Sequence, residues 1–487
     1  MNFKFRISNL ELRMKARRVS SFFIRNSKFE ILLLVLLATA CASTRNDVGS
    51  AKSPATPWTP PANTVPAATP VSRNDLTLPP NFTPGMAITL GQVVDIALAN
   101  NSTTRLAWLQ ARAAQAGVGS AESTYLPEVD VDAQIANTRT TSTRSQTTFG
   151  PSLALNYLLF DFGGRAATVE GARQTLIASN FLHNQAIQDV ILRTHQAYYS
   201  YLDARALLAA EDATIKEREK SLDSADARHN AGVATIADVL QARTALSQAV
   251  LNRETIQGNL RAIEGALATT MGLPATTRFD FGELPHDVPT QQVAEAVDAL
   301  IARAVTQRPD LAAARASAER ADVRIREVRS QFLPSVGLSG GLGPSWISGG
   351  GGGATMTHSV AVGMRWPVFT GFQNAFDVRQ AEIEAQAARE DLRALEQQVD
   401  LQVWTSYYAL QTATQRLTTV RDLLTSAQQS VDVAQSRYSA GVGSILDLLT
   451  AESALESARA QEVQARTDWF LSVAQLAHDT GSLEPLS

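Results

Sequence analysis

Residues Arg228–Leu246 read RHNAGVATIADVLQARTAL, and a closely similar stretch, RYSAGVGSILDLLTAESAL, follows at Arg437–Leu455. Ten of the nineteen positions are identical at a constant offset of 209. The arginine that opens each copy would lie in the last turn of an incoming helix, where a cation faces the negative end of the helix dipole. Gly232 and Gly441 are of the residue type that closes such a helix in the left-handed conformation. Each copy therefore predicts a helix that ends in a tight turn.

A second helix is expected to begin directly after each turn. Thr235 is followed three residues later by Asp238, and Ser444 is followed in the same way by Asp447. A Ser or Thr with an acidic residue at this spacing is typical of a capping box at a helix N-terminus.

The duplication extends over most of the chain. Upstream pairs recur at nearly the same offset: Tyr198–Tyr199 with Tyr407–Tyr408, Leu159–Phe160 with Val368–Phe369, and Tyr125–Pro127 with Phe332–Pro334. Repeats of about 200 residues are duplicated half-domains rather than the short units of a solenoid. We therefore expect repeat 1 at 87–285 and repeat 2 at 286–487.

Composition favours helices and argues against several classes of partner. The 487 residues are 45% hydrophobic and only 6% aromatic, which suits closely packed long helices. Residues 1–40 carry eight Lys/Arg against two Glu, so the remaining chain has a net charge of −10 and is unlike a nucleic-acid-binding protein. There is one cysteine, and the six histidines are dispersed without metal-ligand spacing. We expect no cofactor, no metal site and no nucleic-acid partner.

The N-terminal region predicts export and a membrane anchor. Residues 1–30 are basic, and the apolar run Ile31–Ala40 is too short to span a membrane, so residues 1–40 resemble a secretory signal. The sequence LATAC at Leu37–Cys41 resembles a lipobox, in which the cysteine is lipidated, although ATA is also an ordinary cleavage site. We favour lipidation of Cys41. Nine prolines within 42–84 then predict an extended linker, so we assign 41–86 to a spacer after the anchor.

Each repeat contains a predicted β-hairpin with one apolar face. Val129, Val131, Ala133 and Ile135 alternate with Asp130, Asp132 and Gln134, and a second alternating run ends at Leu159. The second hairpin places Val336, Leu338 and Leu342, and then Val360, Val362, Met364 and Trp366, on one face. This pattern fits strands of a transmembrane barrel, and it fits a hairpin packed on a soluble core equally well.

About 65 residues without proline separate each hairpin from its glycine turn, which predicts two helices about 100 Å long at 1.5 Å per residue. The second one carries the three-four spacing of a coiled-coil seam, at Leu410, Ala413, Leu417, Val420, Leu424, Ala427, Val431 and Ala434. In each repeat two shorter helices would stack end to end along the long one. The predicted fold class is mostly α, with long coiled-coil hairpins and four strands per chain.

Four strands cannot close a barrel, and an open edge in lipid would leave backbone groups unpaired. At least two chains must therefore share one barrel, because eight strands are the usual minimum.

The repeats resemble the TolC family of bacterial outer-membrane channels. The resemblance covers about 88–480 and rests on the paired hairpins after Y/F-L-P, on Leu159–Asp161 with Gly163–Gly164, and on the two glycine turns. Phe369–Gly371 departs from it, since the family often has F-D-G there. The resemblance implies a homotrimer, a twelve-stranded barrel in outer-membrane lipid, a periplasmic tunnel, and docking on a periplasmic adaptor and an inner-membrane transporter.

The resemblance also suggests roles for residues of the turns. We expect the adaptor to dock at the distal tip, formed by Arg228, Gly232, Val233, Asp238, Arg437, Gly441 and Val442. In the family the second turn carries acidic residues that narrow the closed pore. The first of these matches Asp447 and the second falls on Thr450, so any acidic ring would be single. The competing interpretation is that Asp447 only completes the capping box.

The predicted function is therefore a passive exit duct of a tripartite efflux or secretion system. Two alternatives remain at this point: a type I protein secretion channel, and a lipid-tethered coiled-coil scaffold without a pore. An enzyme is disfavoured, because the sequence has no phosphate loop, nucleophile elbow or metal constellation.

Overall fold

The computed structural model describes residues 87–139, 146–285, 288, 296–348 and 353–483, all within the compact unit Leu76–Ser487. The predicted signal, Cys41 and linker lie outside these residues. The first repeat contains these elements: β1 (Ala87–Ile88), α3 (Leu90–Asn100), α4 (Ser102–Glu122), a 3-10 turn (Ser123–Tyr125), β2 (Glu128–Thr138), β3 (Gln146–Phe160), α5 (Gly164–Asn230) and α6 (Ile236–Thr270). After β4 (Asp280–Phe281) the order recurs: α7 (Val297–Gln307), α8 (Pro309–Ser330), β5 (Ser335–Ser348), β6 (Gly353–Arg365), α9 (Gln373–Ser439) and α10 (Ile445–Asp479).

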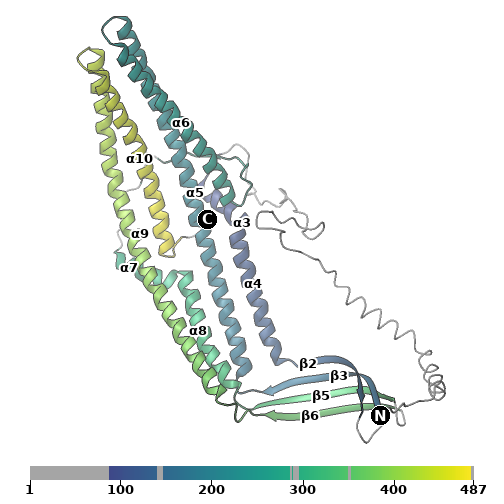
Figure 1. Cartoon of the computed structure of the whole chain (residues 1–487). Helices are drawn as coiled ribbons and strands as arrows, with labels where there is room; N and C mark the ends of the chain where they lie inside the picture. The colour runs from purple at the N-terminus through teal and green to yellow at the C-terminus, as the bar shows by residue number, and fades with distance from the viewer. Residues whose placement is uncertain (1–86, 140–145, 286–287, 289–295, 349–352, 484–487) are drawn as a thin grey trace, which may run out of the picture. The chain divides into compact units, whose positions relative to one another are not determined.

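The two long helices confirm the predicted coiled-coil hairpins. α5 and α9 each contain 67 residues, and α6 and α10, which return from the glycine turns, each contain 35. The sheet lies at one end of α5 and α9 and the turns lie at the other (Figure 1). Every predicted seam residue of α9 is buried except Leu424 and Ala434, which are partly buried in the same apolar cluster.

The shorter helices stack end to end along the long ones, as predicted. α5 packs against both α4 and α6, and α9 packs against both α8 and α10. At the first junction the Asn101 side chain caps α4 and also donates to the carbonyl of Thr270 at the end of α6, at 3.1 Å. At the second junction Arg308, just before α8, donates to the carbonyl of Asp479 at the end of α10, at 3.2 Å. These contacts make each pair of short helices continuous.

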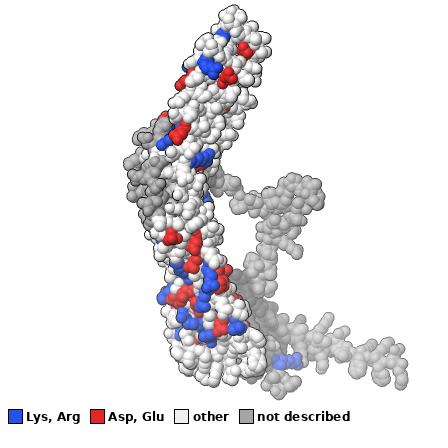
Figure 2. Space-filling view, turned by 90° about the vertical axis from the view of Figure 1, so that its left-hand side faces the viewer, with Lys and Arg blue, Asp and Glu red and all other residues white. Residues whose placement is uncertain are grey.

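The four longer strands form one antiparallel sheet in the order β2-β3-β5-β6. Each repeat contributes one hairpin, and the β3–β5 pair joins the two hairpins into one sheet. The neighbouring helices follow the same order, since α4 contacts α5, α5 contacts α8, and α8 contacts α9. Ion pairs join α8 and α9 near the sheet, such as Arg329 with Glu382 at 2.6 Å. On the face in Figure 2, charged side chains gather on these helices, and the surface below them shows none.

Three details of the fold differ from the sequence-based expectation. β2 and β3 extend further than predicted, so the loop between them is shorter than 137–148. Trp366 lies just beyond the end of β6, because Pro367 follows it and cannot donate to a ladder. The two-residue parallel pair β1–β4 was not predicted, since two residues carry no periodicity. Ile88 and Phe281 of this pair are buried in one apolar cluster with Leu202 of α5.

Candidate functional site

The strand register places the predicted apolar residues on one face of the sheet. Each row across the strands unites residues from both hairpins. The rows are Val129–Leu155–Gly340–Val360, Val131–Leu153–Leu342–His358, Tyr157–Leu338–Val362 and Ile135–Phe149–Trp346–Ala354. Val131, Val360 and Val362 are 76%, 81% and 67% exposed. Because no helix of the described chain covers this face, it is an apolar surface without a partner within one chain.

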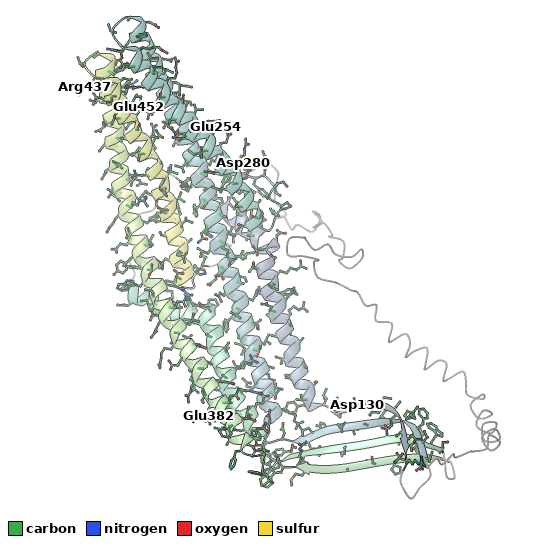
Figure 3. The ribbon with its side chains drawn as sticks, in the orientation of Figure 1. Asp130, Glu254, Asp280, Glu382, Arg437 and Glu452 are labelled. Atoms are coloured by element: carbon green, nitrogen blue, oxygen red, sulfur yellow. The ribbon has the colours of Figure 1, made fainter. Side chains whose placement is uncertain are left out.

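The opposite face of the sheet is polar and asymmetric in charge. Glu128, Asp130 and Asp132 alternate along β2, and their partners on β3 are Asn156, Ala154 and Ser152. On this face β6 contributes Arg365, its last residue, and uncharged side chains along the rest of the strand. Figure 3 labels Asp130 on β2 at the sheet edge. The alternation predicted from the sequence is therefore confirmed on both faces.

A network that the sequence analysis missed fixes the passage from strand β3 to helix α5. The Asp161 carboxylate accepts from the backbone N–H of Arg165 at 2.6 Å and pairs with its guanidinium. The same guanidinium lies 4.7 Å from the Tyr125 ring centroid and donates to the carbonyl of Leu159 at 3.1 Å. Phe162 adopts a φ of 53°, an uncommon conformation for a bulky residue. In the sequence, the motif Leu159–Asp161 with Gly163–Gly164 marked this junction but did not reveal the contacts of Arg165.

The distal turns have the predicted local geometry. Gly232 and Gly441 adopt φ of 75° and 81°, which only glycine accepts without strain. Val233 and Val442, which follow the glycines, are 63% and 68% exposed. Each turn therefore presents a valine to the exterior at the end of a coiled coil.

The two predicted tip arginines have different surroundings. Arg228 donates to the carbonyl of Tyr438 at 2.7 Å, and its guanidinium lies 4.9 Å from the centroid of that ring. It thereby ties the first distal turn to the second one. Arg437 is exposed near the second turn, as Figure 3 shows.

Both capping boxes are present. Asp238 accepts from the backbone N–H of Thr235 at 3.2 Å, and Asp447 accepts from that of Ser444 at 3.4 Å. Asp447 is exposed, and Thr450, also exposed, bonds back to the carbonyl of Leu446. The capping role is therefore present for both aspartates, and the predicted constriction at Asp447 and Thr450 stays a prediction.

Within the described ranges, no three His, Cys, Asp or Glu side chains are grouped so as to hold a metal ion. His478 instead forms ion pairs with Asp189 at 2.9 Å and with Asp479 at 3.1 Å. Burial disfavours the charged imidazole, but these two hydrogen-bonded carboxylates raise the pKa of His478 to about 9. None of the helices described has the length and apolar content needed to cross a bilayer.

Comparison with known proteins identifies the family. The model of the outer membrane efflux protein family matches residues 93–273 and 300–482. The chain belongs to the outer membrane efflux protein family. Its two matched segments together cover well over half of the 487 residues.

Individual relatives agree with this membership. Protein CyaE of Bordetella pertussis is 29% identical over 387 residues, which cover 77% of this chain and 80% of CyaE. The outer membrane protein TolC of Escherichia coli is 25% identical over 412 residues, 81% of this chain and 82% of TolC. Among solved structures, the outer-membrane channel OprN has a TM-score of 0.73 at 20% identity, covering 81% and 90% of the two chains. VceC of Vibrio cholerae has a TM-score of 0.70 at 21% identity, covering 80% and 96%.

The chain is therefore an outer-membrane efflux channel protein that extends into the periplasm, and it is not an enzyme. A coiled-coil scaffold without a pore, which the helix pattern alone left open, is wrong.

Proposed function

We propose that three copies of this chain form one twelve-stranded barrel in the outer membrane, continued by a periplasmic tunnel of long helices. The observation that carries the proposal is the pair of open sheet edges. β2 and β6 each have a neighbour on one side only, and every residue of both strands is exposed. In lipid these edges require partners, and β6 of one copy beside β2 of the next would supply them.

The helices carry matching free edges. α4 and α9 stand at the two ends of the helix order, and both expose apolar side chains. On α4 these are Leu106, Trp108 and Leu109, and on α9 they are Leu401, Trp404 and Tyr408, all between 41% and 65% exposed. Closing the barrel would bring α9 of one copy beside α4 of the next and cover both apolar faces.

The distal turns are the proposed docking tip for a periplasmic adaptor, which in turn would connect an inner-membrane transporter. The reason is their position at the ends of α5 and α9 away from the sheet, together with the exposed Val233 and Val442. The other proposed tip residues are Arg228, Gly232, Asp238, Arg437 and Gly441. Relatives at 25% identity are named as toluene and antibiotic efflux pump outer membrane proteins of Pseudomonas putida, which supports efflux as the proposed function, with type I protein secretion as the alternative.

At the other end of the chain we propose cleavage after Ala40, lipidation of Cys41, and a spacer to residue 86. The duplicated body then divides into 87–285 and 286–487. Metabolic labelling with palmitate tests the anchor: the unmodified chain should take up label and Cys41→Ala should not. Label on the variant, or none on the unmodified chain, would contradict the assignment.

The barrel itself is tested by mass and by conductance. In detergent the full chain should have the mass of three copies, and in a planar bilayer it should form conducting channels. A monomer without larger species, or a trimer that never conducts, would refute the proposal.

A further inference from the structure

The charged side chains of the sheet lie on its two edge strands. The inner strands β3 and β5 contain no Asp, Glu, Lys or Arg. β2 contains Glu128, Asp130 and Asp132, and β6 contains Arg365. All four side chains are exposed, and none of them takes part in an ion pair with another residue of the described chain. The two free edges therefore carry opposite charges that a single chain leaves unmatched.

These charges lie on the same face of the sheet. The strand register places Glu128 in the row of Asn156 and Ala361. Ala361 and Arg365 are separated by an even number of residues on β6, so their side chains point to the same side of the strand. This is the polar face, which would line the lumen of the proposed barrel. An arginine and several carboxylates would therefore meet on the lumen side of the seam where β6 of one copy joins β2 of the next.

The strand ends show in which direction one copy is shifted along the next. β6 continues to Arg365, four residues beyond the row of Glu128, which is the first residue of β2. β5 likewise begins at Ser335, four residues beyond Ser339 in the same row. Strands whose ends lie at one level of a membrane are staggered in this way when they are tilted against the barrel axis. The sheet of one chain thus already carries the stagger of a tilted barrel.

Closing the barrel continues this stagger at the seam. If the first residue of β2 pairs with the last residue of β6, all eleven residues of β2 have partners. For twelve strands this stagger of about four residues per chain corresponds to a tilt of about 35°, given a rise of about 3.3 Å per residue and a strand spacing of about 4.8 Å. The next stagger that keeps the two faces separate, about six residues, gives about 45°. Outer-membrane barrels lie within these limits. A stagger in the opposite direction would leave more than half of β2 unpaired in lipid.

Both staggers provide Arg365 with an acidic partner. The smaller one places Arg365 opposite Glu128 of the next copy, and the larger one places it opposite Asp130. Side chains directly opposite each other have Cβ atoms about 4.5–5.5 Å apart, and a long side chain also reaches the diagonal neighbour at about 7–8 Å. A guanidinium has five N–H donors and can bind two carboxylates at once. Arg365 can therefore contact both acidic residues in either register.

We propose that Arg365 of one copy binds the carboxylates of Glu128 and Asp130 of the next copy on the lumen side of the seam, and that these ion pairs fix the register in which the copies join. The inference rests on the proposed trimer and goes beyond it by naming the side chains through which one copy recognises the next. The partner of the β6 edge is thus a second copy of this chain, presenting an acidic β2 edge.

Disulfide trapping in outer-membrane vesicles tests the contact in a chain that keeps all its other charges. The full-length variants combine Arg365→Cys with either Glu128→Cys or Asp130→Cys and are oxidised with copper phenanthroline. At least one pair should give covalent trimers that dithiothreitol returns to monomers. Arg365→Cys with Gln134→Cys is the matched control on the same face of β2 and should stay monomeric on the gel, as should the unmodified chain with its single Cys41.

Exchange of the charges tests their contribution to assembly. Arg365→Glu should lower the amount of trimer in the outer membrane several-fold, because like charges would then face each other at every seam. Glu128→Lys with Asp130→Lys should lower it in the same way. A chain that carries all three changes has the charges reversed across the seam, and its trimer should return to within about twofold of the unmodified amount.

The outcomes separate this inference from the proposed assembly. Trimers that give no cross-link from either acidic position, or a cross-link from the Gln134 pair alone, would overturn the inference while leaving the trimer in place. If the charges only kept the edges of single chains apart from one another, Arg365→Glu would assemble as well as the unmodified chain, and that result would also overturn it. An unmodified chain that is monomeric in the membrane would refute the proposed trimer itself.

Discussion

The carboxylate of Asp447 already has a partner in a single chain, since it completes the capping box with Ser444. In a trimer three such carboxylates would surround one axis if the second turn lines the tunnel. Such a ring of negative charge would attract cations. Asp238 makes the same capping contact in the first turn. It therefore serves as the control that distinguishes a role in helix capping from a role in the pore.

We predict that Asp447→Asn weakens the block of single-channel current by divalent cations, while Asp238→Asn leaves it unchanged. Both changes neutralise the carboxylate at the third helical position of a capping box and should cost a similar amount of helix stability, about 0.3–1 kcal/mol. Equal block in both variants and in the unmodified channel would remove Asp447 from the pore.

His478 gives the fold a pH dependence with a defined sign. Its pKa rises from 6.5 to about 9 in the folded chain, because the hydrogen bonds with Asp189 and Asp479 outweigh the effect of burial. The stabilisation is therefore complete below pH 6.5 and is lost as the pH rises through about 9. We predict that Tm falls over this interval and that the loss amounts to at most about 3.4 kcal/mol per chain.

Thermal unfolding of His478→Gln between pH 6 and about pH 10 checks this. The variant should be less stable than the unmodified chain at the low end and nearly equal to it at the high end. His358→Gln, which changes a histidine of strand β6, serves as the control. A difference between His478→Gln and the unmodified chain that does not vary with pH would contradict the linkage.

At the scale of elements, the glycine turns set where each coiled coil ends. A Cβ at Gly232 would meet no atom within 4 Å, and one at Gly441 would meet only the Arg228 guanidinium, at 3.6 Å or more. A valine there is strained by the left-handed backbone alone, at a cost of about 1 kcal/mol or more. We predict that Gly232→Val and Gly441→Val fold but weaken docking of the adaptor and lower efflux.

Cross-linking of the adaptor to the tip measures this effect. Gly258→Val is a suitable control, because Gly258 lies within α6 and a Cβ there also meets open space. Docking that survives both turn substitutions in normally folded protein would refute the tip assignment.

The elements that periodicity encodes were predictable, and single contacts across elements were not. The seam of α9, the capping boxes and both faces of the sheet follow from spacing along one segment. The pairing of Arg218 with Glu452 joins residues 234 positions apart. Each of them alone resembles one of the many charged residues on a helix surface, so no local pattern distinguishes a buried pair from a solvated one. The same holds for the contact between Arg228 and Tyr438, which depends on how the two coils pack.

At the scale of the whole molecule, the sheet must present one face to lipid and the other to water. A soluble protein would cover Val131, Val360 and Val362 with other side chains, yet these three remain at least two-thirds exposed in one chain. Membership in an outer-membrane family explains the exposure, because lipid would cover this face. The acidic strand β2 would then line the water-filled lumen.

Two adjacent residues of β6 separate the lipid from the lumen. Val360 shares a row with Val129 and Leu155, and Ser359 lies in the row of Asp130 and Ala154 on the opposite face. An arginine on the lipid face of a barrel costs up to about 2–4 kcal/mol at the bilayer midplane, while one in the lumen remains hydrated. We predict that Val360→Arg lowers the amount of trimer in the outer membrane several-fold. Ser359→Arg should keep the trimer and instead shift the ion selectivity of single channels away from cations.

Trimer abundance on gels and reversal potentials in a salt gradient measure the two effects. If Ser359→Arg depletes the trimer and Val360→Arg does not, the faces are assigned the wrong way round; if both leave abundance and selectivity unchanged, this sheet does not form the wall of the barrel.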